Sequence, residues 1–166
     1  MHKTLNRTIA AGVLLALAGA AQAATKSDSF QVSALVEKNC VISAADMDFG
    51  TFDGTNDRTA TSDISVSCTD GTTYDVDLST GSSGDYTQRT LQFGADVLNY
   101  NLYTDGTFGT IWGDNSPGTG RPGTGTGGGM AVTQTLTVHG ELLAADNTHA
   151  FGAGTYVDNV VATITY

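Results

Sequence analysis

The sequence predicts an all-β sandwich built from a single domain, and three observations lead to this prediction. Apolar residues recur at every second position in many short segments. No segment after residue 23 shows a sustained 3.6-residue period, and turn dipeptides such as Asp70-Gly71 and Asp105-Gly106 separate the segments. Without a predicted leader at residues 1–23, about 143 of the 166 residues remain, which is enough for one domain with its own core.

The leader has the layout of a secretory signal peptide. Basic Lys3 and Arg7 precede an apolar run at residues 9–18, and Ala21-Gln22-Ala23 predicts cleavage after Ala23. The run is too short for a membrane-spanning helix, and no later stretch of the sequence is a candidate. We therefore expect an exported protein, for which a Gram-negative periplasm and cell surface would be suitable compartments.

The charge balance is strongly acidic. Of the seven basic residues, Lys3 and Arg7 leave with the leader, so five remain against seventeen acidic ones and the mature net charge is about −12. Nucleic acid is excluded as a partner because its phosphates require a basic face, and an anionic membrane surface is disfavoured for the same reason. The simplest interpretation is that the charge keeps an exported protein soluble.

The segment behind the leader, residues 29–37, has the pattern of a strand with one apolar face at a free chain end. Leu35 interrupts an alternation whose apolar members are Phe30, Val32, Ala34 and Val36. Such a strand either pairs within its own domain or is donated to another chain, because unpaired strand edges recruit partners. Which of the two occurs decides the function.

Further strands are expected in order along the chain, at residues 40–46, 47–52, 64–68, 74–78, 91–93, 98–102, 132–143 and 155–166. Residues 64–68 and 74–78 are predicted to form a hairpin around Asp70-Gly71, with Asp75 and Asp77 on its solvated face. Residues 113–129 are rich in glycine and are predicted to form a flexible loop without a packed strand. In the last strand one face carries Val160, Ala162, Ile164 and Tyr166.

The chain has only two cysteines, Cys40 and Cys68. In an exported protein two such thiols on separate strands favour one disulfide, which should stabilise the fold by roughly 3 to 4 kcal/mol. A metal site is disfavoured because no histidine flanks either cysteine.

Signals for chemistry are weak, and we expect no enzyme, metal site or cofactor. Residues 118–123 fit the pattern GxGxxG but lack the strand before and the helix after that a dinucleotide loop needs. His139 and His149 have no motif partner. Asp75 and Asp77 could act as the acid and base of a glycosidase, although a solvated strand face is the simpler interpretation.

A cluster of aromatic residues allows an alternative function. Its members are Tyr100, Tyr103, Phe108 and Trp112. They could line a sugar-binding face, although aromatic residues in so small a sandwich more often fill the core.

Several motifs occur in a fixed order along the mature chain: Cys40-Val-Ile with Phe49-Gly50, Ile64-Ser-Val-Ser-Cys68, Tyr74-Asp-Val-Asp-Leu-Ser-Thr-Gly81, Arg89-Thr-Leu, Leu98-Asn-Tyr-Asn-Leu-Tyr-Thr-Asp105, Trp112-Gly-Asp114 and the ending from Gly154 to Tyr166. In this combination the chain resembles the spore coat protein U domain family, which includes the pilins of archaic (Csu-type) chaperone–usher pili.

The resemblance implies an incomplete immunoglobulin-like β-sandwich that is completed by a donor strand from a neighbouring subunit. Residues 24–37 would be the donor extension, and residues 38–166 the pilin domain with the family's disulfide between Cys40 and Cys68. The donor residues would be Phe30, Val32, Ala34 and Val36. The acceptor groove would lie beside residues 155–166, including Val160, Ala162, Ile164 and Tyr166.

The resemblance also implies partners and a location. A periplasmic chaperone would fill the groove first, and the carboxylate of Tyr166 would anchor the basic residues of that chaperone. At an outer-membrane usher, the next identical or related subunit would then replace the chaperone. The product would be a surface pilus that supports adhesion and biofilm formation. The sequence departs from the family pattern in two places. It has Gly140-Glu141-Leu142 where the family commonly has Gly-Arg-Ile, and the donor residue Ala34 has a small side chain.

Two other functions remain open from the sequence. One is a secreted carbohydrate- or surface-binding module that uses Tyr100, Tyr103, Trp112 and the glycine-rich stretch. The other is a coat protein of spores or cells with the same fold.

Overall fold

The computed structural model describes residues 22–166, so nearly all of the predicted leader lies outside the described residues. Residues 22–39 have no regular secondary structure and are exposed to solvent. The strand predicted at residues 29–37 is therefore absent from the single chain. Because an extended segment becomes a strand only when a second strand completes its hydrogen-bond ladder, the alternating pattern alone does not produce one here.

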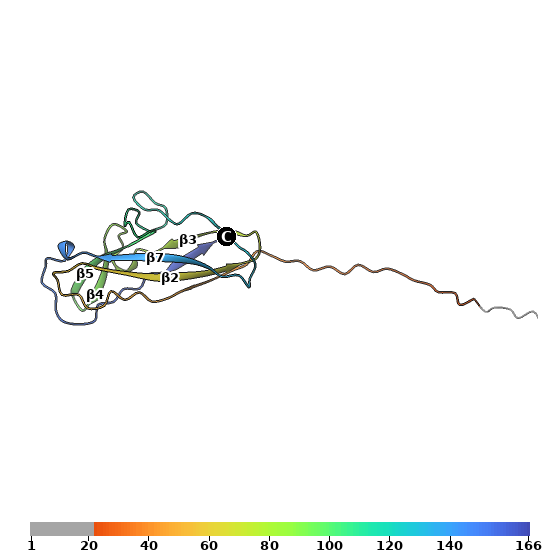
Figure 1. The fold of residues 1–166 in the computed structure, drawn as a ribbon, viewed down its shortest axis with the longest axis horizontal. Helices are drawn as coiled ribbons and strands as arrows, with labels where there is room; N and C mark the ends of the chain where they lie inside the picture. Colours follow the sequence, from red (N-terminus) through yellow and green to blue (C-terminus); the bar gives the residue numbers. More distant parts are fainter. Residues whose placement is uncertain (1–21) are drawn as a thin grey trace, which may run out of the picture. The chain divides into compact units, whose positions relative to one another are not determined.

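The larger sheet has five antiparallel strands in the order β1-β2-β7-β5-β4 (Figure 1). Their bounds are β1 Cys40–Ala44, β2 Arg58–Cys68, β4 Arg89–Phe93, β5 Asp96–Tyr103 and β7 Gln134–Leu142. β2 is the longest, and its alternating burial places Ile64, Val66 and Cys68 on the buried face.

The smaller sheet has three strands in the order β6-β3-β8. Their bounds are β3 Thr73–Leu78, β6 Gly125–Thr126 and β8 Ala162–Thr165. Two short 3-10 helices complete the regular structure, η1 at Gly81–Ser83 and η2 at Ala144–Asp146. No α-helix occurs between residues 22 and 166, and no helix there is long and apolar enough to cross a membrane.

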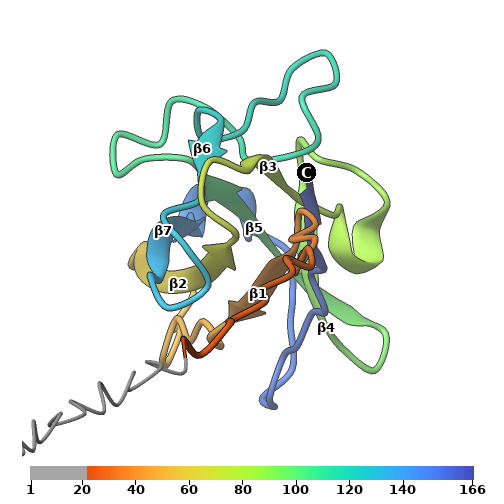
Figure 2. The same ribbon diagram turned by 90° about the vertical axis from the view of Figure 1, so that its right-hand side faces the viewer.

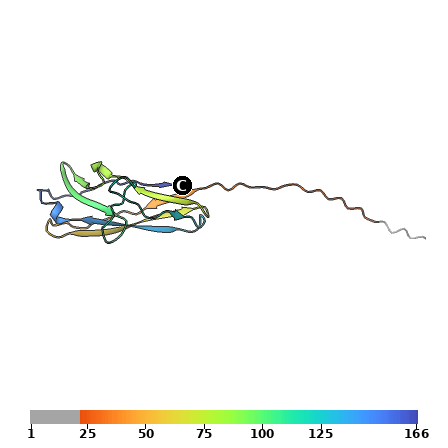
Figure 3. The ribbon, with the colours of Figure 1, turned by 90° about the horizontal axis from the view of Figure 1, so that it is seen from above.

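The core lies between the two sheets. Seen from above, β3 and β8 form one layer and β2 and β7 the other (Figure 3), and Figure 2 shows the same arrangement along the strands. The buried apolar residues come from both layers and from one loop: Ile64, Val66, Cys68, Tyr74, Val76, Leu78, Leu98, Tyr100, Leu102, Trp112, Val138 and Leu142. The predicted all-β sandwich is thus confirmed.

The predicted hairpin between residues 64–68 and 74–78 is wrong. β2 pairs with β1 and β7, whereas β3 pairs with β6 and β8 in the other sheet. The turn between them, where Thr72 N–H donates to the carbonyl of Thr69 (3.0 Å), carries the chain across the sandwich. Alternation tells which face of a strand is buried, but it does not identify the partner strand.

Other strand predictions need smaller corrections. Residues 47–52 form no strand, although Met47, Phe49 and Phe52 pack against the core. In the C-terminal region only Ala162–Thr165 is a regular strand, with an isolated bridge at Val157. The glycine-rich stretch contains β6, so the expectation that no packed strand occurs there is also wrong.

Candidate functional site

An apolar groove of about 500 Å³ opens on one side of the sandwich. One wall is formed by the end of β1 and the segment that follows it, residues 44–49, and the other by residues 156–162. Core side chains from both sheets form the floor: Ile64, Leu78, Leu91, Tyr100, Leu102 and Val138. An apolar opening that leads directly to the core is a site where a further apolar segment could complete the packing.

The first wall is held by backbone contacts to β2. Ala45 N–H donates to the carbonyl of Asp63 (3.0 Å), and the hydroxyl of Ser62 donates to the carbonyl of Ala45 (2.6 Å). Met47 and Phe49 then lie over Gly140 of β7, where a Cβ would collide with both side chains. The glycine is therefore required for the close approach of this wall to the sheet.

The second wall is a segment that changes sheets. Val157 exchanges two backbone hydrogen bonds with Gln92 of β4 (2.8 and 3.0 Å), whereas β8 begins at Ala162 and pairs with β3. Between them Val161 is fixed by Ser79, whose N–H donates to the Val161 carbonyl and whose hydroxyl accepts from the Val161 N–H (both 2.9 Å). The crossing leaves the opening between this segment and β1.

Asp158 anchors the second wall from within the groove lining. Its carboxylate accepts hydrogen bonds from Ser82 N–H (2.8 Å), Ser82 hydroxyl (2.6 Å) and Tyr100 hydroxyl (2.7 Å). Burial by itself raises the pKa of Asp158, but these hydrogen bonds outweigh it and hold the pKa below its usual value. Burial, followed by the bond to Asp158, raises the pKa of Tyr100. The wall is thus held in place by polar contacts of the chain itself.

The groove is bordered by two free strand edges. Within residues 22–166 β1 pairs only with β2, and β8 pairs only with β3. In an antiparallel ladder, hydrogen-bonded residue pairs alternate with pairs that are not bonded. Since Ser79 N–H donates to the Val161 carbonyl, the next pair of the β3–β8 ladder, Leu78 with Ala162, is not bonded, and neither is Val76 with Ile164. The backbone groups of Ala162 and Ile164 therefore point away from β3, toward the unoccupied edge.

The residues predicted as groove residues are partly brought together. Val160 and Ala162 line the groove, and Ile164 packs against the core from the same face of β8. Tyr166 is half exposed and lies outside the lining. The residues predicted as donors are Phe30, Val32, Ala34 and Val36, and all four are exposed.

The predicted disulfide is present. Cys40, the first residue of β1, is bonded to Cys68, the last residue of β2, and the two residues are also partners in the strand register. The bond therefore ties the groove-side edge strand to the long central strand.

Arg89 supports the site, and no pattern in the sequence assigned it that role. It is fully buried, and its guanidinium donates to the carbonyls of Ser79 (2.9 Å) and Trp112 (2.7 Å) and to Oδ1 of Asn101 (2.7 Å). Burial lowers the pKa of Arg89. Because its bonds reach Ser79, which holds Val161, Arg89 braces the second wall from behind.

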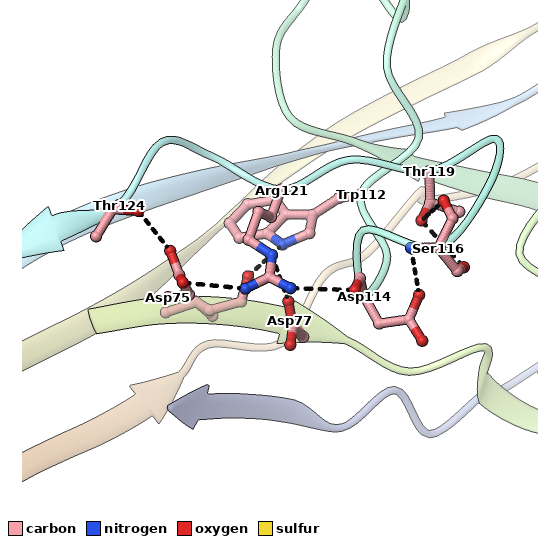
Figure 4. Close-up of polar contacts among 9 residues, drawn as sticks. Asp75, Asp77, Trp112, Asp114, Ser116, Thr119, Arg121 and Thr124 are labelled. Atoms are coloured by element: carbon pink, nitrogen blue, oxygen red, sulfur yellow. Dashed lines mark hydrogen bonds and ion pairs between the residues drawn. The ribbon is translucent and has the colours of Figure 1, made fainter. Parts of the chain in front are cut away.

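The opposite edge of the small sheet, along β3, is closed by residues 112–126 (Figure 4). β6 pairs with the first two residues of β3, Thr73 and Tyr74. Farther along, the indole Nε1 of Trp112 donates to the Val76 carbonyl (2.9 Å), and Leu78 N–H donates to the Gly113 carbonyl (3.2 Å). Both of these bonds use backbone groups of β3 that would otherwise be free.

Side chains complete this closure. Arg121 forms ion pairs with Asp75 (3.1 Å) and Asp77 (3.0 Å) and donates to the Asp114 carbonyl (3.1 Å), as Figure 4 shows. The hydroxyl of Thr124 donates to Asp75 (2.9 Å). Asp75 and Asp77 are therefore half-buried under the loop, not on a freely solvated face as predicted. The contacts tie the loop to β3, and its flexibility stays a prediction.

The aromatic cluster is divided between the core and the surface. Trp112 is fully buried, and the hydroxyl of buried Tyr100 is used by Asp158. Tyr103 packs edge-on against Phe108 with ring centroids 5.4 Å apart. These four residues do not form one continuous platform for a sugar. Between residues 22 and 166 no group of three His, Cys, Asp or Glu side chains is arranged to hold a metal ion.

The fold is similar to that of a solved structure. A solved structure with a similar fold is the chaperone–tip adhesion subunit pre-assembly complex CsuC–CsuE from archaic chaperone–usher Csu pili of Acinetobacter baumannii. The TM-score is 0.53 at 22% sequence identity, and the match covers 79% of this chain but 40% of that one. No curated protein sequence matches.

The family comparison covers most of the chain. The profile of the spore coat protein U domain matches residues 26–163, which include both walls of the groove, the disulfide and most of the exposed N-terminal segment. The resemblance inferred from the ordered motifs is thereby confirmed, and the chain belongs to the Spore Coat Protein U domain family.

Proposed function

We propose that this protein is a structural subunit of a surface pilus that is assembled by chaperone–usher donor-strand exchange. In this proposal residues 24–37 of one copy fill the groove in the domain, residues 38–166, of another copy. The observation that carries it is the apolar groove, which opens to the core between two unpaired strand edges. A strand laid there would satisfy both edges and cover the floor.

The exposed N-terminal segment has the apolar surface that such a strand needs. Phe30, Val32 and Val36 are between 81% and 86% exposed, so almost all of their apolar area is available for burial. Their burial would contribute on the order of 5 to 9 kcal/mol, at roughly 1.5 to 3 kcal/mol each. Backbone bonds to Ala162 and Ile164 would add about 0.5 to 1.5 kcal/mol each. Ala34, with its small side chain, would suit a narrower part of the groove.

The strand register favours one direction for the donor. Cys40 pairs with Cys68 and Thr165 pairs with Asp75, so the start of β1 and the end of β8 lie at the same end of the domain, which we call the near end. Val157 and the β4–β5 hairpin lie at the opposite, far end (Figure 1). A donor antiparallel to β8 brings the second domain to the far end, away from the first copy's own extension.

This direction makes the contact head-to-tail. Because the donor and the groove are different surfaces, each copy can bind one neighbour at each end, and contacts of this kind that do not close into a ring produce filaments. A linear polymer of identical or related subunits is the expected product.

The family and the similar structure support the remaining partners of the proposal. We infer that a periplasmic chaperone occupies the groove before assembly, with the terminal carboxylate of Tyr166 as an anchor, and that an outer-membrane usher exchanges it for the donor. The similar structure is a complex of a chaperone with a pilus subunit before assembly, which supports the chaperone step. Export through the periplasm to the cell surface and a role in adhesion and biofilm formation complete the proposal. No catalytic role, metal or cofactor is part of it.

The test is to remove the donor. We expect the mature chain without residues 24–37 to lose polymer formation, as judged by electron microscopy and by size-exclusion chromatography. A sharper test uses two variants, each of which changes one face of the donor segment. Phe30→Ser with Val32→Ser and Val36→Ser should abolish polymers, whereas Gln31→Ala with Ser33→Ala, on the other face, should leave them. If the truncated chain polymerises as well as the intact one, the proposal is wrong.

A coat protein of spores or cells remains the second candidate, because the matching family profile is named for a spore coat protein. The two functions differ in their partners. Genes for a chaperone and an usher beside this one would favour the pilus, and their absence would favour the coat.

A further inference from the structure

Three residues separate Val36, the last donor residue, from β1: Glu37, Lys38 and Asn39. Three-residue loops are common connections between antiparallel strands, and their usual form is a type I turn followed by one residue with positive φ. Asn39 stands at that last position, and asparagine tolerates positive φ better than most residues do. The donor residues, this loop and β1 therefore have the sequence pattern of a β-hairpin.

The free edge of β1 has the hydrogen-bond phase that such a hairpin needs. Toward β2, the Asn39 carbonyl accepts from Thr69 N–H (2.9 Å), and Ala45 N–H donates to the Asp63 carbonyl (3.0 Å). The odd-numbered residues of β1 are therefore bonded to β2, because bonds to one neighbour involve every second residue. The backbone groups of the even-numbered residues point to the free edge: Cys40, Ile42 and Ala44.

The loop length also sets which residues would lie opposite each other in the hairpin. The pairs would be Val36 with Cys40, Ala34 with Ile42, and Val32 with Ala44. Residues that lie directly opposite share one face of a sheet. Cys40 and Ile42 pack against the core, and Ala44 lines the groove. The apolar face of the donor residues would therefore point into the groove of their own domain.

Leu35 interrupts the alternation of the donor segment, and the hairpin would give it a partner. It would lie opposite Val41, on the outer face of β1. Leu35 is 83% exposed and Val41 is 55% exposed, so both side chains have apolar area to bury. Apolar pairs that lie directly opposite each other stabilise two paired strands. Donation to another copy makes no use of Leu35, because its side chain would point away from the groove.

We propose that a subunit without a partner closes its own groove: residues 30–36 fold back as a hairpin with β1 and lie between β1 and β8. This inference rests on the proposed function, because the same segment and the same groove serve both states. The strand directions differ. β1 begins and β8 ends at the near end, so a segment antiparallel to β1 is parallel to β8, whereas the donor from another copy is antiparallel to β8.

The closed state determines how a free subunit behaves. A short linker gives the segment an effective concentration on the order of millimolar at its own groove, so closure is favoured over donation in dilute solution. A closed subunit neither presents its donor nor accepts one, so opening must come before polymerisation. Closure also requires a rotation at Asn39, whose φ is not positive in the structure with the segment exposed.

The test uses the mature chain, residues 24–166, as a monomer that is refolded by dilution and isolated by size-exclusion chromatography. Amide hydrogen exchange is followed by mass spectrometry. We expect residues 30–36 to exchange at least about tenfold more slowly than residues 24–28, because the hairpin bonds protect their amides. If both segments exchange at the same rate in the monomer, self-closure is refuted.

A matched pair at residue 39 tests the hairpin itself. Asn39→Val should reduce the protection of residues 30–36 about tenfold, because a β-branched residue is strained at positive φ, and its monomers should polymerise faster. Asn39→Gly should keep the protection, since glycine adopts positive φ freely. Both variants keep the backbone bonds of residue 39 to Thr69. Leu35→Ser should reduce the protection up to about fivefold. Equal protection in the two residue-39 variants would refute the hairpin.

The outcomes separate this inference from the proposed function. If residues 30–36 exchange rapidly in the monomer and slowly in polymers, self-closure is refuted and donor-strand exchange stands. If these residues are protected in the monomer, Asn39→Val removes the protection, and no polymer forms at any concentration, self-closure stands and donor-strand exchange is refuted.

Discussion

The two edges of the β6-β3-β8 sheet differ: the backbone groups are covered at one edge and free at the other. Along β3 the backbone groups of Tyr74, Val76 and Leu78 are covered by β6, by the Trp112 indole and by Gly113, and Arg121 lies across the outer face. Along β8 the groups of Ala162 and Ile164 face an apolar groove. Since unpaired edges recruit strands, this difference would direct the proposed strand addition to one side of the molecule.

The closed edge requires glycine at two positions of residues 113–129. A Cβ at Gly125 would collide with the ring of Tyr74, and a Cβ at Gly127 would lie 2.5 Å from the Thr69 carbonyl oxygen. Glycine is therefore needed where the loop approaches the sheet closely. At these two positions glycine serves packing.

The largest effect is expected when the open edge is blocked. Ala162→Lys places a charge in the apolar groove, and burying an unpaired charge costs several kcal/mol, so polymer formation should fall by at least about a hundredfold. Thr163→Lys, one residue along and on the exposed face of β8, is the matched control and should polymerise normally. Sedimentation of polymers measures both. Equal loss in the two variants would show that the groove face of β8 is not where the donor binds.

Removal of the disulfide is expected to have the next largest effect. Among residues 22–166 β1 has one strand partner, so Cys40–Cys68 is a principal constraint on the groove-side wall. The bond joins residues with a sequence separation of 28. The double replacement Cys40→Ala with Cys68→Ala should lower the free energy of unfolding by about 3 to 4 kcal/mol. Urea unfolding of the mature chain measures the change. A loss below about 1 kcal/mol would mean that β1 is held mainly by its hydrogen bonds to β2.

These comparisons also show what the sequence could and could not predict. Alternation identified β3, β5, β7 and residues 64–68 of β2, because buried apolar residues recur there at every second position. It missed residues 58–63 of β2. Two cysteines allowed only one disulfide. Strand pairing was missed between β2 and β3, since a turn that crosses the sandwich resembles a hairpin turn locally. Asp158 and Arg89 were missed as supports of the groove because their partners, Ser82, Tyr100 and Ser79, become neighbours only in the folded chain.

Opening the closed edge should have a moderate effect. Arg121→Ala leaves Asp75 and Asp77 close together without their cation, and we expect a loss of about 1 to 3 kcal/mol in the free energy of unfolding together with lateral association of polymers. Arg58→Ala is the control, because its ion pair with Asp53 is longer (3.8 Å) and exposed and should contribute less than about 1 kcal/mol. Unfolding curves and electron microscopy report the two effects. If both variants behave alike, Arg121 does not close the edge.

The smallest effect concerns pH, and the two edges should respond with opposite signs. The pKa of Asp158, beside the groove, is lowered, so its contribution to stability is present above its unfolded pKa and is lost as pH falls through the folded value. The pKa of Asp77, under the loop, is raised by burial, which outweighs the attraction of Arg121. Its contribution is therefore present below the unfolded pKa and is lost as pH rises through the folded value.

Single replacements should separate these two contributions. In urea unfolding between about pH 2 and pH 6, Asp158→Asn should reduce the loss of stability in acid, and Asp77→Asn should increase it. Each change in slope is limited to about 1.4 kcal/mol per pH unit, because each residue binds one proton. If both replacements changed the acid loss of stability in the same direction, the two edges would not differ in this respect. The carboxylates at the open and closed edges would then experience the same balance of burial and hydrogen bonding. Opposite signs would show that the groove wall is held by a charged carboxylate, which weakens when that group is protonated.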